Sequence, residues 1–86
     1  MTITEAKVRV AFIKWGASYL YEIGKKNPGG CALEFTTDQT KGMKFVDQTT
    51  ALIVRDHLQE EGYADIHGET LPLEVRDEEI GIALNL

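Results

Sequence analysis

The chain has 86 residues, enough for one domain over residues 1–86 with a modest core, which leaves little room for a deep active site. The hydrophobic fraction of 43% and the charged fraction of 27% are those of a folded protein and exclude extended disorder. No apolar run approaches the ~20 residues of a membrane span, and the N-terminus does not resemble a signal peptide. We therefore expect a cytoplasmic protein, or one that acts inside a host cell, that does not bind membranes.

The net charge of −5 is unevenly distributed along the sequence. Residues 1–55 contain eight basic and five acidic residues, whereas residues 56–86 contain nine acidic residues and one basic residue. An acidic half repels nucleic acid and attracts basic surfaces, including the grooves that hold nucleic acid in other proteins. A surface that only keeps the protein soluble is the alternative interpretation, and the sequence leaves both open.

The N-terminal segment predicts a hairpin. Residues 7–15 (KVRVAFIKW) and 19–23 (YLYEI) are rich in β-branched and aromatic residues, and Gly16 lies in the turn between them. One face of the first strand would carry Val8, Val10 and Phe12, and the other Lys7 and Arg9. A single helix over residues 4–26 is the rival interpretation, which the capping-box spacing at its start favours and Gly16 opposes.

The middle of the chain predicts a third strand between polar connections. Residues 25–30 (KKNPGG) form a loop, because proline cannot join a central ladder and the two glycines permit positive φ. Residues 31–36 (CALEFT) form the strand, a polar turn covers residues 37–42, and residues 43–46 are extended.

A helix is the clearest element of the sequence. Asp47 is a favourable N-cap and Gly62 a favourable C′ residue. Between them, Ala51, Val54 and Leu58 form one apolar stripe. Ile53 lies outside this stripe, so it either packs under the loop before the helix or contributes to a partner surface.

The C-terminal part predicts short strands. Residues 63–67 would turn back at residues 67–70 and pair with an edge strand over residues 71–75, which contains Pro72. Residues 76–79 (RDEE) would be a charged turn, and residues 80–86 a last strand or a docked tail. The expected fold is α+β, a small antiparallel sheet with one amphipathic helix on one face in the approximate order β-β-β-α-β-β.

The candidate chemistry is weak. Asp65, His67 and Glu69 alternate, and on one strand face they could ligate a divalent metal, although a solvated polar face is the simpler interpretation. Cys31 could act as a nucleophile with His57 or His67 as its base, but no cysteine-hydrolase signature surrounds it. We therefore predict no catalytic residue, no metal ligand and no cofactor, and we rank an enzyme last.

Part of the sequence resembles the small orphan proteins that phages and other mobile elements encode. The resembling pieces are YLYEI, ALEFTTDQTKGMKF and the helix DQTTALIVRDHLQEEGY, which together cover about half of the chain. Inhibitors of CRISPR nucleases belong to this kind of protein. The resemblance implies a non-enzymatic role in host interaction, and it carries no functional residue.

These observations predict a protein-binding inhibitor of a nucleic-acid-handling machine, with a CRISPR nuclease as the leading partner, whose acidic half occupies a basic groove. The expected partner-binding residues are Ile53, Asp56, His57, Glu60, Glu61, Tyr63, Asp65, Glu69, Asp77, Glu78 and Glu79. A homodimer through an edge strand at residues 71–75 or 80–84 is also consistent with the pattern.

The alternative function is a small regulator that binds nucleic acid with a basic N-terminal sheet. Its aromatic stacking groups would be Trp15, Tyr19 and Tyr21. Its basic residues would be Lys7, Arg9, Lys14, Lys25, Lys26, Lys41 and Lys44.

Overall fold

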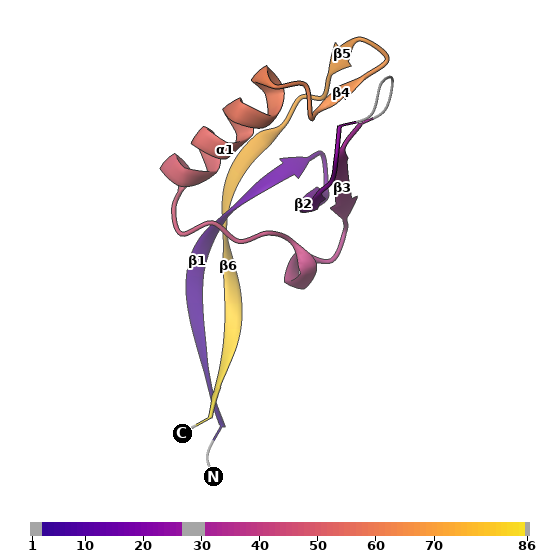
Figure 1. Ribbon diagram of the computed structural model, residues 1–86. Helices are drawn as coiled ribbons and strands as arrows, with labels where there is room; N and C mark the ends of the chain where they lie inside the picture. The colour runs from indigo at the N-terminus through magenta and orange to yellow at the C-terminus, as the bar shows by residue number, and fades with distance from the viewer. Residues whose placement is uncertain (1–2, 27–30, 86) are drawn as a thin grey trace.

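The computed structural model describes residues 3–26 and 31–85. Its elements, in chain order, are β1 (Ile3–Trp15), β2 (Ser18–Ile23), β3 (Leu33–Thr36), the 3-10 turn η1 (Gln39–Lys41), α1 (Gln48–Glu60), β4 (Asp65–Ile66), β5 (Glu69–Thr70) and β6 (Glu74–Asn85). Four strands form an antiparallel sheet in the order β3-β2-β1-β6, and β4 pairs with β5 separately. The predicted α+β class is confirmed (Figure 1).

The N-terminal hairpin is confirmed, and the single helix is excluded. β1 and β2 pair antiparallel around a turn at Gly16, whose φ of 59° favours glycine. The alternation of β1 weakens at Ala11 and Ile13 because both sheet faces are covered there: Ala11, Phe12 and Ile13 are all 0% exposed. β3 begins two residues later than predicted, and residues 27–30 of the expected loop lie outside the described residues.

The helix is confirmed with both of its ends. The Asp47 carboxylate accepts a hydrogen bond of 2.8 Å from the backbone N–H of Thr50, and Gly62 has a φ of 82°. Ala51 and Leu58 are buried in the core with Ile13, and Val54 packs against them. The predicted packing stripe is therefore correct.

The C-terminal prediction is wrong in two places. The strands at residues 63–67 and 71–75 are replaced by β4 and β5, a short hairpin whose turn residues His67 and Gly68 both have positive φ. The charged turn at residues 76–79 does not exist, because these residues lie inside β6. β6 pairs with β1 along its whole length, from Lys14↔Glu74 to Ile3↔Asn85, so this distant pairing overrides the local preference of four charged residues for a turn.

The core lies where the sheet is covered on two sides. α1 covers the face that carries Ala11 and Ile13. Leu73 and Ala64 belong to the same buried cluster. On the other face, Phe12 packs edge-on against Tyr19 with ring centroids 4.8 Å apart. The segment after β3 closes this side at Gly42, where an added Cβ would lie 3.2 Å from the Phe12 ring.

We call the part of the molecule that contains this core the head, and an arm extends from it. β1 and β6 continue past the other elements as a two-stranded ribbon, with Ile3 and Asn85 paired at its tip (Figure 1). The ribbon makes the molecule elongated, with principal extents of 53 × 21 × 20 Å. The predicted edge at residues 80–84 is correct, since β6 is the outer strand of the sheet.

Candidate functional site

The outer face of α1 carries an exposed apolar side chain among polar ones. Ile53 is 66% exposed, which excludes packing under the preceding loop. Asp56, His57 and Glu60 lie three, four and seven residues further along and are exposed on the same face. We call Ile53, Asp56, His57, Glu60 and Glu61 the acidic helix surface.

The charges of this surface are only partly neutralised. Asp56 forms an ion pair of 2.8 Å with Arg55, its neighbour on the helix. Both partners are solvated, so this pair is weak and exchangeable. Glu60 and Glu61 are exposed and make no ion pair within residues 3–26 and 31–85. A basic partner would therefore meet two unengaged carboxylates beside Ile53.

The C-terminal end of α1 is tied to Lys26, which lies between β2 and β3. Lys26 donates a 2.8 Å hydrogen bond to the carbonyl oxygen of Glu61 and lies 5.2 Å from the Tyr63 ring centroid. On the helix side, the His57 ring lies 6.2 Å from that of Tyr63. Tyr63 is thus half-buried between two side chains, and only part of its ring is available to a partner.

Asp65, His67 and Glu69 do not form the predicted row on a strand. They belong to the β4–β5 hairpin, in which Asp65 opposes Thr70 and His67 is in the turn. The Asp65 carboxylate accepts a hydrogen bond of 2.8 Å from the Thr70 hydroxyl, whereas Glu69 is exposed. Among the described residues, no group of three or more His, Cys, Asp or Glu side chains could hold a metal ion.

Cys31 has polar contacts with backbone groups. Its sulfur accepts a 3.4 Å hydrogen bond from the Leu33 N–H and lies 3.6 Å from the carbonyl oxygen of Tyr63. The side chain is half-buried against the core. These contacts connect β3 to the loop after α1, which is a structural role.

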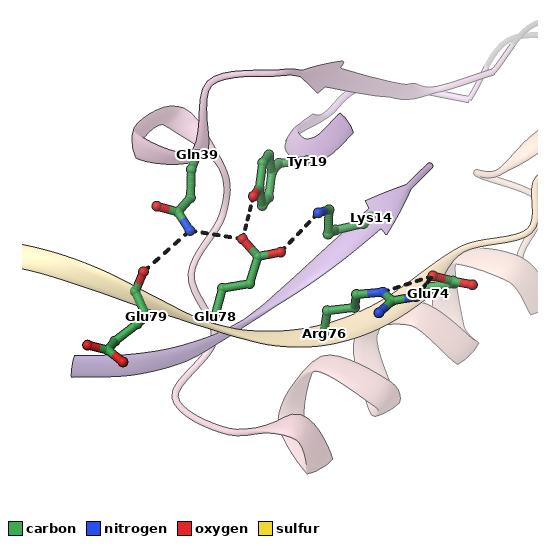
Figure 2. Close-up of polar contacts among 7 residues, drawn as sticks. All are labelled: Lys14, Tyr19, Gln39, Glu74, Arg76, Glu78 and Glu79. Carbon is green, nitrogen blue, oxygen red and sulfur yellow. Dashed lines mark hydrogen bonds and ion pairs between the residues drawn. The ribbon is translucent and has the colours of Figure 1, made fainter. Parts of the chain in front are cut away.

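The three acidic residues of β6 do not form one surface. Successive residues of a strand point to opposite sides, so Asp77 and Glu79 are exposed on one side and Glu78 faces the other. Figure 2 shows Lys14, Tyr19 and Gln39 converging on the Glu78 carboxylate from β1, β2 and η1. Glu78 therefore connects four elements of the head, and its carboxylate is engaged within the chain, unlike those of Asp77 and Glu79.

The hydrogen bonds of Glu78 agree with the directions in which the pKa values of Glu78, Lys14 and Tyr19 are shifted. Lys14 Nζ donates a 2.9 Å hydrogen bond to Oε2 of Glu78. Gln39 Nε2, at 2.9 Å, and the Tyr19 hydroxyl both donate to the other carboxylate oxygen, Oε1. Burial opposes ionisation of Glu78, but the three donors together outweigh it and hold its pKa below the usual value. The hydrogen bonds to Glu78 raise the pKa of both Lys14 and Tyr19. All three directions indicate an ionised carboxylate at neutral pH.

Two apolar side chains that were not among the predicted site residues are also exposed, one just before α1 and one on it. Val46 is 80% exposed and Leu52 37% exposed. Val46 precedes the N-cap, a position from which a hydrophobic residue usually packs on the fourth helical residue. That residue is Ala51, whose methyl group is too short to cover a valine. An alanine at the fourth helical position is therefore the signal in the sequence that would have indicated that Val46 is exposed.

No protein-family model, no curated protein and no solved structure matches the chain. Within the described residues, no helix is both long enough and apolar enough to cross a membrane.

Proposed function

We propose that this chain is a non-enzymatic binding protein whose acidic helix surface docks on a basic surface of a larger protein. The observation that carries the proposal is Ile53, which is 66% exposed and flanked by Asp56 and Glu60 on the same helix face. An apolar anchor surrounded by charges is a common arrangement in protein interfaces, where the anchor sets residence time and the charges set the association rate.

The more specific form of the proposal names the partner. A groove that holds nucleic acid is basic, and CRISPR nucleases have such grooves, so inhibition by occupation of the groove fits the acidic half of this chain. Glu69, on the hairpin after α1, and Asp77 and Glu79, on one side of β6, are exposed and add to this negative half. Glu78 has no part in the proposed contact because it is held by Lys14, Tyr19 and Gln39.

The test is an affinity capture of the tagged protein from bacterial lysates that contain a CRISPR nuclease with its guide RNA, at low and high salt. The proposal expects recovery of the nuclease at low salt and its loss as salt rises. The double variant Glu60→Lys/Glu61→Lys should abolish recovery. A control, Glu22→Lys/Glu34→Lys, gives the same net charge on exposed β2 and β3 positions and should still capture the nuclease.

Equal loss of capture in both double variants would show that net charge, and not the acidic helix surface, determines binding. Capture of nucleic acid without a protein partner would instead favour the alternative function. The structure gives that alternative less support, because Lys14 is paired with Glu78 and Tyr19 is only 9% exposed. Trp15 is 44% exposed but packs on Phe35, with ring centroids 5.5 Å apart.

A further inference from the structure

The arm has one aliphatic face. The register opposes Ala6 to Ile82 and Val8 to Ile80, and directly opposed residues point to the same side of a sheet. Val10 follows on the same side, two residues nearer the head. We call these five residues the aliphatic arm face. Val8 is 37% exposed and Ile82 is 40% exposed, so the middle of the arm presents apolar surface to water.

The other face of the arm is charged and balanced. Glu5, Lys7 and Arg9 alternate along β1, and Glu79 opposes Arg9 on β6. All four are exposed. Two acidic and two basic side chains give no net field toward nucleic acid or an anionic membrane. A ligand of either kind therefore has no electrostatic reason to bind the arm.

The head reaches only the near end of the aliphatic arm face and does not cover the rest. Gln39, Thr40 and Lys44 approach its near end and leave a pocket of ≈ 370 Å³ against Ile80 and Ile82. Beyond this border, no other described element lies along the arm (Figure 1). An isolated two-stranded ribbon is marginally stable in water, so burial of this face would stabilise the arm.

We propose that the aliphatic arm face packs against the same face of a second copy of this chain, about a twofold axis. A twofold interface brings each surface against itself, which favours an uncharged, self-complementary patch. Here Glu5, Lys7, Arg9 and Glu79 lie on the opposite face and stay in water when two arms meet. Glu78, which opposes Val10 at the inner end of the aliphatic side, is already held by Lys14, Tyr19 and Gln39. The pocket beside Ile80 offers a place for an aliphatic side chain of the second arm.

The expected dimer is weak. Eight paired positions, from Ile3↔Asn85 to Val10↔Glu78, form the ribbon. At ~3.3 Å per residue and ~5 Å between strands, one face measures roughly 26 by 10 Å and buries a few hundred Å² per copy. This is below the ~800 Å² per partner of a standard interface. We therefore expect association in the micromolar range or weaker.

Edge-to-edge pairing of two β6 strands is the competing arrangement. It would bring the exposed Asp77 and Glu79 of the two copies close together, and charged side chains on an edge oppose such pairing. The face-to-face dimer avoids this repulsion. It also leaves α1 accessible, since α1 packs on the sheet side that carries Ala11 and Ile13.

The test combines mass and cross-linking. Sedimentation or light scattering from low to high micromolar protein should show the mass rising from 9.6 kDa toward twice that value. In a Cys31→Ser background, Val8→Cys and Ile80→Cys should form covalent dimers with a short bis-maleimide at high concentration. Lys7→Cys, next to Val8 but on the charged face, is the matched control and should remain monomeric.

A constant monomer mass over the whole range would overturn the proposal, as would equal cross-linking from Lys7→Cys and Val8→Cys. Growth past the dimer would indicate open edge pairing and would also overturn it. Val8→Glu should abolish the rise in mass while the far-ultraviolet circular dichroism stays native. Retained capture of the nuclease by this variant would separate the dimer from the proposed function, since the acidic helix surface is intact in it.

Discussion

Removal of the Glu78 carboxylate should destabilise the whole head. Glu78→Ala leaves the Lys14 ammonium, the Tyr19 hydroxyl and the Gln39 amide without their shared acceptor. The side chains of Lys14 and Glu78 are 13% and 23% exposed, so water replaces the lost bonds only in part. Hydrogen bonds to a charged group contribute ~1.5–3 kcal/mol each, and incomplete burial reduces this sum. We expect a loss of ~2–3 kcal/mol of unfolding free energy.

For a domain of this size, such a loss lowers the Tm by roughly 10–20 °C, which differential scanning calorimetry or a urea titration measures directly. Glu79→Ala is the matched control: Glu79 is the next residue of β6, it is exposed, and its carboxylate has no partner among the described residues. That change should stay within ~0.5 kcal/mol. A Glu78→Ala cost no larger than that of Glu79→Ala would refute the role given to the cluster.

The same prediction has a pH signature. The folded-state pKa of Glu78 is lowered, chiefly because three donors outweigh the opposing effect of burial. A group with a lowered folded pKa contributes its full stability above its unfolded pKa of ~4.3 and loses it as the pH falls through the folded value. The stability gap between wild type and Glu78→Ala should therefore be constant near neutral pH and shrink in acid. A gap that is independent of pH down to acid unfolding would contradict an ionic cluster.

Three further outcomes are expected from urea titrations and binding assays. Gly42→Ala should cost ~1–3 kcal/mol, because its Cβ would lie 2.9 Å from that of Tyr19. Asp47→Ala should lower the urea midpoint of unfolding by removing the cap of the Thr50 N–H. Since that hydrogen bond lowers the pKa of Asp47, its contribution should fade as the pH falls below ~4. Ile53→Asn should change stability by less than ~0.5 kcal/mol yet weaken capture of the nuclease at least tenfold.

The helix and the first hairpin were predictable because their signals are local. The Asp47 carboxylate caps the N–H of Thr50, three residues on, and the Gly62 N–H bonds the carbonyl of Gln59, three residues back. The alternation of residues 7–15 is likewise visible within one strand. Each signal is complete within about fifteen residues. Packing then only had to agree with the local preference, which it did in both elements.

β6 was not predictable in the same way. Its first half reads EVRDEEI, with five charged residues in seven, and local rules place such a run in a turn. The run becomes a strand because its partner, β1, begins at the other end of the chain. Glu78 is accommodated only because Lys14, Tyr19 and Gln39 meet it there, and no local pattern indicates that meeting. The same pairing separates Glu78 from Asp77 and Glu79 and thereby divides the acidic run that looked continuous in sequence.

Glu78 also marks the point at which the arm leaves the head. It opposes Val10, so it lies on the same side of the ribbon as Val8 and Ile80. Toward the head, that side is filled by Phe12, Tyr19 and the segment around Gly42. Toward the tip, the same side continues as aliphatic residues that the head does not cover. The carboxylate thus fixes η1 and β2 against β6 at the inner end of the row, and the apolar surface beyond it remains available to a second arm.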